Sequence, residues 1–323
     1  MPRAILLFAL IWILANAYCF GQANYFDYHS RVLSAERLIA TESYQEALAV
    51  YDQLFSDFEF VFLREHKVAA QLAVYLNQTQ RAFDYLGLGV ANGWTLKEIK
   101  KNNILKKLKK EVQWAHLELN YEALREDFSN RMNAPVRTRV EQMFRKDQKL
   151  ALKYYFKPGD EAREKLIQEE GIPHSEAQIG DLLEILNQTG YPGEQLIGNS
   201  LWMTTILCHH NSLSPEYQQS DDIYPNLKPR LMVEVSKGMM DPYDLALIDD
   251  WYIAVKSGRK EKSYGYINHI SNQDELAKAN QLRADLFIRS IELRNQLVDI
   301  QNKTKMDFYL AGETWVKGKI VVP

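Results

Sequence analysis

Two adjacent histidines and two adjacent aspartates in the second half of the chain are the side chains best suited to chemistry. His209-His210 ends an apolar stretch that predicts a helix, and Asp249-Asp250 lies inside another predicted helix. A carboxylate that orients an imidazole can support acid–base catalysis. His209, His210 and Asp249 are therefore the candidate catalytic residues. One hypothesis for this protein is a hydrolase or metal-dependent enzyme with a cleft lined by histidine and aspartate.

A metal ion at the two histidines would need further ligands. Successive side chains of a helix point about 100° apart, so both rings reach one ion only where the helix frays. Zinc takes three or four protein ligands, and the preceding turn offers only Thr205 and Ile206. An aspartate from the other helix would have to complete the site. The sequence leaves both metal and cofactor open.

A structural interpretation of the same residues is also open. One histidine would face the core, and the other would cap carbonyl groups at the helix C-terminus, where the helix dipole favours positive charge. Glu234 and Tyr264 complete the polar residues expected around one pocket, as candidate binding residues. No nucleophile elbow, phosphate loop, dinucleotide fingerprint or HExxH motif occurs. The sequence therefore does not decide whether the protein is an enzyme.

Well-marked helix ends must position these residues. Gly238 ends one helix and Asp241-Pro242 begins the next, because aspartate favours the N-cap and proline the first helical position. Ser175 followed by Gln178 is typical of a capping box and predicts a helix start. An apolar period over residues 274–303 predicts one long final helix. Glycine (15) and proline (10) fall mostly at segment ends, so we predict an all-α fold.

Paired amphipathic helices are also predicted in the first third of the chain. Ala47 and Ala82, 35 residues apart, occupy equivalent positions in two such pairs. Small residues at this interval resemble degenerate tetratricopeptide-type repeats, whose period is about 34 residues, although the glycine and proline of a full repeat are missing. The resemblance covers residues 31–118. It implies a domain of helical hairpins that presents a concave surface to a protein or peptide partner.

Tyrosines would line that concave surface. Tyr44, Tyr51 and Tyr85 are candidate binding residues, with Tyr75 beside them. The leading hypothesis is accordingly a binding or scaffold protein that recognises a protein, a peptide or a small ligand. Exposed tyrosines would favour it, whereas a contact between Asp249 and a histidine in an open pocket would favour the enzyme. A third interpretation is a C-terminal domain that binds a small ligand without chemistry.

A further pattern of polar, apolar and glycine residues extends over residues 139–267. Its members are Met143, Asp147-Gln148, Gly190-Tyr191-Pro192, Gly198, His209-His210-Asn211, Leu227, Leu231, Val235, Gly238, Pro242, Ala246, Asp249 and Tyr264-Gly265. In this order they resemble a family of bacterial proteins known only as a domain of unknown function. Ala151 and Tyr266-Ile267 depart from the family pattern, which has arginine and Thr-Gln there. The resemblance implies an all-helical fold with no reaction attached.

The N-terminus has the pattern of an export signal. Arg3 precedes an apolar run over residues 4–15, which suits a signal peptide and is too short to span about 30 Å of hydrocarbon. Small residues allow cleavage after Ala17 or Ala23, and an uncleaved anchor is the alternative. We therefore expect a periplasmic or secreted protein with no integral membrane segment after cleavage.

Charge and cysteine content exclude some classes of protein. The formal net charge is −3, and no basic domain indicates nucleic-acid binding. Of the two cysteines, Cys19 falls in the leader, so Cys208 is left alone and no disulfide framework is expected. Lysines alternate with apolar residues over residues 97–110. They form either the solvated face of a helix or a contact for an anionic partner.

These observations predict four segments. A signal peptide over residues 1–23 precedes a tetratricopeptide-like domain over 24–118 and a helical domain over 119–306. Because two and a half repeats bury little apolar surface alone, we expect the second domain to pack on the first. A tail over 307–323 is expected to form a short hairpin or a strand-like strap around Gly312 and Gly318. The sequence leaves the oligomeric state open.

Overall fold

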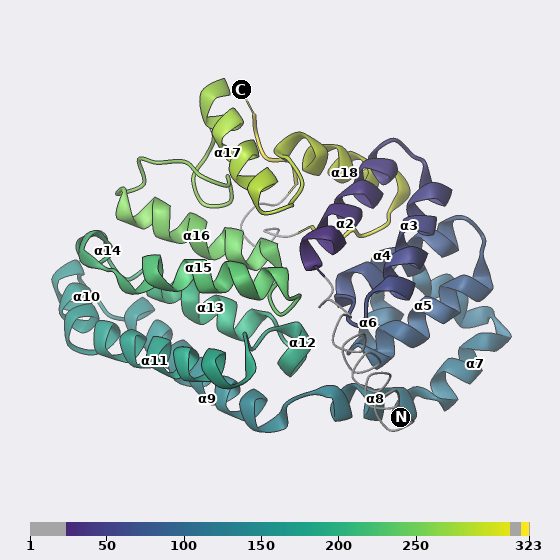
Figure 1. Cartoon of the computed structure of the whole chain (residues 1–323), viewed down its shortest axis with the longest axis horizontal. Helices are drawn as coiled ribbons and strands as arrows, with labels where there is room; N and C mark the ends of the chain where they lie inside the picture. The colour runs from purple at the N-terminus through teal and green to yellow at the C-terminus, as the bar shows by residue number, and fades with distance from the viewer. Residues whose placement is uncertain (1–23, 311–317, 323) are drawn as a thin grey trace, which may run out of the picture.

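The computed structural model describes residues 24–310 and 318–322, and in these ranges the chain forms helices joined by turns, with no β-strand. The all-α fold class is therefore confirmed. Figure 1 shows an elongated molecule, with the first helices of the chain at one end and a stack of longer helices at the other.

The first helices of the chain pack as antiparallel hairpins. They are α2 (Tyr25–Ala40), α3 (Tyr44–Asp57), α4 (Leu63–Tyr75), α5 (Thr79–Ala91), α6 (Leu96–Lys101), the 3-10 helix η1 (Leu105–Lys110), α7 (Val112–Leu119) and α8 (Tyr121–Arg131). Glu42 and Asn77, 35 residues apart, take the left-handed conformation in the two hairpin turns (φ 60° and 59°). Ala47 and Ala82 are fully buried. The interval predicted from the alanines thus recurs in the turns, while the tetratricopeptide resemblance stays a prediction.

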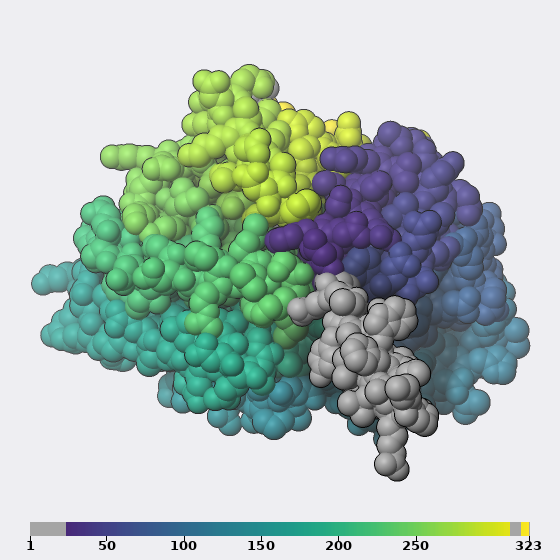
Figure 2. Space-filling model, in the orientation of Figure 1, coloured from purple at the N-terminus to yellow at the C-terminus, as the bar shows by residue number. Residues whose placement is uncertain are grey.

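The hydrophobic core of these hairpins also includes the C-terminal end of the chain. Leu297 of α18 (Ile291–Thr304) and Phe308 after it are buried in the same apolar cluster as the side chains of α2 to α5. Figure 1 shows α18 beside α2, and in Figure 2 the residues of α2 meet those of the later helices along a continuous seam. A helix that we predicted within the second domain therefore packs into the core of the first.

The remaining helices form a layered stack. They are α9 (Ala134–Tyr155), α10 (Asp160–Leu166), the π-helical turn η2 (Ile167–Gly171), α11 (Ile172–Thr189), α12 (Glu194–Ile197), α13 (Leu201–His210), α14 (Pro215–Ser220), α15 (Ile223–Ser236), α16 (Pro242–Lys256) and α17 (Gln273–Asp285). Helix α13 contacts α9, α11 and α16. Its sequence is apolar on most faces, as expected for a helix enclosed by its neighbours.

One predicted helix start is wrong. Ser175 lies inside α11, which begins at Ile172 as a continuation of η2. The Ser175 hydroxyl is 2.8 Å from Nδ1 of His210, and Gln178 donates to a carbonyl of α9, so tertiary contacts occupy both members of the supposed capping box.

The single helix predicted over residues 274–303 is also wrong, because the chain turns between α17 and α18. Phe287 takes the left-handed conformation (φ 55°). The Ser290 hydroxyl then accepts the amide of Leu293 and caps α18. Leu286 and Ile288 are buried within the turn, so the apolar period continues although the helix does not.

A buried group of charged side chains joins the two ends of the molecule. Arg64 of α4 donates to Glu36 of α2 and to Glu65, the latter at 2.9 Å. Arg289 lies 3.4 Å from Glu36, and its Nε donates to the hydroxyl of Tyr243 on α16 at 2.7 Å. Removing one member of a buried ion pair costs about 3–5 kcal/mol. This group therefore fixes α2, α4 and α16 relative to one another.

Some predictions fall on residues outside the described ranges. The signal peptide of residues 1–23 is one, and the centre of the tail hairpin, residues 311–317, is another. In the described parts of the tail, 307–310 and 318–322, no strand forms. Among the described helices, none is long and apolar enough to cross a membrane. The lysines of residues 97–110 are exposed and the apolar residues between them are buried or half-buried, as on the solvated face of a helix.

Candidate functional site

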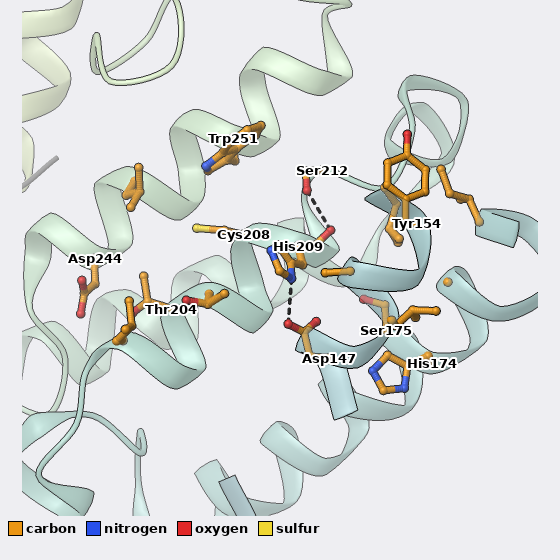
Figure 3. A pocket seen from close by; sticks show the side chains of 18 of the residues that line it. Asp147, Tyr154, His174, Ser175, Thr204, Cys208, His209, Ser212, Asp244 and Trp251 are labelled. Atoms are coloured by element: carbon orange, nitrogen blue, oxygen red, sulfur yellow. Dashed lines mark hydrogen bonds and ion pairs between the residues drawn. The ribbon is translucent and has the colours of Figure 1, made fainter. Parts of the chain in front are cut away.

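A cavity of about 530 Å³ lies between α9, α11, α13 and α16. Most of its wall is apolar, with Leu150, Tyr154, Leu166, Ile167, Leu213, Leu247 and Trp251 among the lining residues. Its polar residues lie at different points along it, as Figure 3 shows. Asp244 and Thr204 are at one end, Tyr154 and His174 at the other, and Asp147 with His209 between them.

His209 and Asp147 form the polar centre of the cavity. Nδ1 of His209, in the last turn of α13, is 2.7 Å from a carboxylate oxygen of Asp147 on α9. The Asp147 side chain is 7 % exposed and also accepts a hydrogen bond from Gln148, whereas that of His209 is 39 % exposed. Because a carboxylate accepts only a protonated ring nitrogen, Asp147 holds the Nδ1–H tautomer in neutral His209. Nε2 is then an acceptor, and no described residue occupies it.

His210 points into a separate environment, as expected for adjacent residues of a helix. Its side chain is fully buried, with Nδ1 2.8 Å from the Ser175 hydroxyl and Nε2 3.6 Å from Asp221. Burial by itself would raise the pKa of Asp221, but the nearby His210 ring and hydrogen bonds from two backbone amides outweigh it and lower that pKa. His210 therefore links α11, α13 and the start of α15, and the two histidines do not share a ligand.

Asp249 does not join the histidines. Its oxygens accept from the hydroxyls of Tyr224 and Tyr264, both at 3.1 Å, and from the ammonium of Lys228 at 2.7 Å. Asp250 accepts from the Ser263 hydroxyl and from two backbone amides of the following loop. The predicted contact between Asp249 and a histidine is therefore absent. The reason is that the face of α16 that carries Asp249 packs on α15, while a different face lines the cavity.

The other candidate residues of the second half have structural contacts. Glu234 near the end of α15 accepts the amide of Tyr191 at 2.9 Å and the ammonium of Lys237 at 2.7 Å. It therefore pins the turn before α12. Tyr264 is buried and bonded to Asp249. Neither residue lines the cavity.

The tyrosines expected in a groove are core residues. Tyr44, Tyr51 and Tyr85 are 7 %, 0 % and 4 % exposed, and only Tyr75, at 41 %, is accessible. The hydroxyl of Tyr85 bonds to Asp52 at the edge of the core. An open groove lined by these tyrosines is therefore absent, because the apolar period that placed them on one helix face describes a buried face.

Asp244 lies in the first turn of α16, at the end of the cavity next to Thr204 (Figure 3). Enclosure by the protein raises the pKa of its carboxyl well above the usual value, and the nearby carboxyls of Asp241 and Glu194 raise it further. The nearby Thr204 hydroxyl opposes these effects, although it donates its proton to the carbonyl of Ser200 at 2.8 Å. The carboxyl stays partly accessible because it lines the cavity. No lysine or arginine lines the cavity with it.

Other chemistry at this site is limited by its composition. In the described parts of the chain, no three side chains of histidine, cysteine, aspartate or glutamate gather so that they could hold a metal ion. Cys208 lines the cavity, but burial raises the pKa of its thiol, so the nucleophilic thiolate is disfavoured. The arrangement that remains is an apolar cavity with an oriented imidazole and a carboxyl.

Asp147 and Asp244 were not among the predicted site residues, although the sequence holds a signal for each. Asp147 continues the buried stripe of Val140 and Met143 on α9, and a carboxylate at an apolar position is a candidate for function. Asp244 shares its helix face with Leu247 and Trp251, at spacings of three and seven residues. The missed signal is a charged residue at an apolar position.

Comparison of the chain with protein-family models, with curated proteins and with solved structures found no match. The two resemblances inferred from the sequence therefore stay predictions, and the geometry of the cavity is the basis for a functional proposal.

Proposed function

We propose that this protein binds a small, predominantly apolar molecule in the cavity between α9, α11, α13 and α16. The observation that carries the proposal is the cavity itself. Its volume of about 530 Å³ is within the roughly 300–1,000 Å³ typical of small-ligand pockets. Its wall combines a large apolar area with a few polar groups, and that combination gives both affinity and orientation to a bound molecule.

The polar groups in the wall support a specific ligand rather than nonspecific apolar binding. His209 is oriented by Asp147 and offers Nε2 as a hydrogen-bond acceptor. Asp244 and Thr204 offer further polar groups at one end. A ligand with an apolar body and polar atoms at matching positions would contact the apolar wall and these polar groups together. The proposal keeps the predicted binding role but transfers it from the tyrosines of α3 and α5 to the second half of the chain.

Filling the cavity tests this proposal. Ala151 of α9 lines the cavity and is replaced by tryptophan, while its neighbour Leu152, which is 57 % exposed and outside the lining, receives the same substitution as the matched control. Nile red, a neutral apolar dye, is titrated into both variants and the wild type with fluorescence detection. We expect saturable binding of one dye per chain, weakened at least tenfold in Ala151→Trp and retained in Leu152→Trp.

Two outcomes of the titration count against small-ligand binding. Equal dye affinity in Ala151→Trp and in the wild type would place the dye outside the cavity. The absence of saturable binding in all three proteins would contradict the proposed ligand binding directly. Circular dichroism spectra of the variants show whether the fold is retained, so that a loss of affinity is not confused with unfolding.

The pair of His209 and Asp147 supports a second candidate function, acid–base catalysis on the bound molecule. A histidine with Nδ1 held by a carboxylate and Nε2 accessible can take a proton from water or from a substrate. No described serine, threonine or cysteine bonds to Nε2, so the nucleophile in a hydrolysis would be water. Substituting His209 by glutamine would then lower turnover of an ester such as p-nitrophenyl butyrate by at least about 100-fold.

The control for the second candidate is His174→Gln, which changes the other histidine in the cavity wall. We expect it to keep the hydrolysis rate of the wild type. Equal rates in His209→Gln and in the wild type would remove the enzyme hypothesis and leave ligand binding.

The predicted export signal gives this binding function a proposed location outside the cytoplasm. N-terminal sequencing of the mature protein from the periplasm or the medium tests it, with Ala17 or Ala23 expected as the last residue removed. An intact N-terminus at Met1 would support the uncleaved anchor instead.

A further inference from the structure

The charges around the cavity restrict the kind of molecule that it can hold. Two carboxyl groups, those of Asp147 and Asp244, are in the lining, together with the imidazoles of His174 and His209. No lysine or arginine is among the lining residues. An organic anion would therefore meet carboxyl groups without a permanent positive charge to balance it, and burial of an unpaired charge is costly.

The two carboxyl groups differ in their partners. Asp147 has the His209 imidazole and the Gln148 amide. Asp244 lies near the Thr204 hydroxyl, which donates to the Ser200 carbonyl, and no ion pair links Asp244 to a cation in the described ranges. The cavity thus has one carboxyl that accepts hydrogen bonds from two neighbouring side chains and one that has no cationic partner in the described ranges.

The groups that face Asp244 from the surrounding elements are mostly acidic or neutral. Asp241 and Tyr243 lie on the same helix, Glu194 on α12, Tyr191 in the turn before it, and Cys208 with Thr204 on α13. Arg64 and Arg289, whose charges act on the neighbouring Asp241, are engaged by Glu36 and Tyr243. A positive charge placed beside Asp244 would therefore be attracted by several carboxyl groups at once.

Resting on the proposed ligand binding, we infer that the molecule bound in the cavity is an amphiphilic amine, whose ammonium group pairs with Asp244 while its apolar body lies against Leu247 and Trp251. The ammonium group would donate hydrogen bonds to the carboxylate and take the place of the missing counter-charge. The apolar part would extend along α16 toward the pair of His209 and Asp147 (Figure 3).

Proton linkage gives the inference a distinctive pH dependence. Burial and neighbouring carboxyls hold the pKa of Asp244 above its usual value, and a bound ammonium favours the ionised form and lowers that pKa. Amine binding therefore releases a proton from Asp244, so the affinity for an amine rises with pH while the amine stays protonated. A ligand that accepts a hydrogen bond from the protonated carboxyl would show the opposite trend.

Three probes of equal chain length test the ligand class: octylamine, 1-octanol and octanoate. Their dissociation constants are measured by calorimetry at pH 6 and pH 8 with wild-type protein, Asp244→Asn and Asp147→Asn. We expect octylamine to bind at least tenfold more tightly than octanol at pH 8, and octanoate to bind least. The preference for the amine should disappear in Asp244→Asn, persist in Asp147→Asn, and be smaller at pH 6.

The controls separate this inference from the proposed function. Equal affinities for octylamine and octanol, tightest binding of octanoate, or an amine preference that survives Asp244→Asn would overturn the amine while leaving the apolar cavity intact. Failure of all three probes and of Nile red to bind would overturn both. Retained octanol binding in Asp244→Asn shows that the variant is folded and its cavity is formed.

Discussion

Asp249 and Asp250 on α16 differ from Asp147 and Asp244 in the cavity wall in how fully their oxygens are engaged. Asp249 accepts from two tyrosine hydroxyls and a lysine, and Asp250 from a serine hydroxyl and two backbone amides. Asp147 instead has a partly exposed histidine and a neighbouring glutamine, and Asp244 lies near a threonine hydroxyl that donates to a backbone carbonyl.

The comparison separates carboxyl groups that hold the fold together from those available to a ligand. A buried carboxylate that already accepts three hydrogen bonds has little capacity for a further partner, and removing it leaves donors unsatisfied. A carboxyl at a cavity wall with fewer partners can accept another group, and its removal leaves fewer buried donors unpaired. The same residue type on one helix therefore has two roles, decided by the face on which it lies.

The largest effect should come from Asp249→Ala. Because Tyr224 and Tyr264 are buried, their hydroxyls would lose their acceptor, and each unsatisfied buried group costs about 1–3 kcal/mol. We expect the free energy of unfolding to fall by about 4 kcal/mol in urea denaturation. Asp249→Asn keeps an acceptor for the tyrosines and should lose about half as much. A loss below 1 kcal/mol in both variants would contradict the structural role.

The second prediction concerns the pH dependence of stability. It rests on the buried carboxyl group of Glu194, near Asp241 at the start of α16. Burial raises the pKa of Glu194 to about 7, with the charges of Glu65 and Asp241 adding to the effect. From about pH 4.5 to 7 the unfolded chain has this carboxyl ionised while the folded chain keeps it protonated. Folding then takes up a proton at Glu194. The contribution of Glu194 to stability therefore falls as the pH rises through this window and is constant outside it.

Glu194→Gln isolates that contribution. Glutamine can still accept the Leu63 amide, which donates to Glu194 at 2.6 Å, but it does not titrate. A shift of this size corresponds to about 3 kcal/mol, so at pH 8 the variant should be more stable than the wild type by that amount, and equal to it at pH 4. Urea denaturation at both pH values measures this, with the exposed Glu122→Gln as control. An unchanged slope in Glu194→Gln would place the titration elsewhere.

The sequence predicted helices better than it predicted which side chains meet. Apolar periodicity identified the helices and the equivalent alanines, because period and burial are local properties of a segment. It could not distinguish a tyrosine in a core from one in a groove, since both lie on an apolar face, and Tyr51 proved fully buried. The sequence analysis named Asp249 as the partner of a histidine, but the actual partner, Asp147, is 62 residues from His209.

The relative direction of adjacent side chains was the most reliable prediction for the site. Neighbouring side chains of a helix diverge by about 100°, so the rings of His209 and His210 were expected to point in different directions in a regular helix. The structure places them in different environments. Tertiary contacts decided what local patterns could not, as with Ser175, whose hydroxyl meets His210 rather than capping a helix.

The same substitution at two positions of α16 sharpens the comparison further. Asp244→Asn removes a carboxyl whose buried position disfavours its charge, so at pH 7 we expect the free energy of unfolding to rise by about 1 kcal/mol. Asp249→Asn on the same helix should instead lower it. Parallel urea denaturation of the two variants measures the difference. A destabilised Asp244→Asn would show that Asp244 belongs with the structural aspartates.

The smallest effect on stability is expected for Asp147→Asn. Its histidine partner is 39 % exposed, and ion pairs of partly exposed groups contribute about 0–1 kcal/mol, so unfolding in urea should change by less than about 1 kcal/mol. The asparagine oxygen would still accept from Nδ1, but without charge, so nitrogen NMR should show a smaller fraction of the Nδ1–H tautomer of His209. A loss of 3 kcal/mol or more would make Asp147 a structural residue like Asp249. The cavity would then have Asp244 as its one carboxyl free to respond to a ligand.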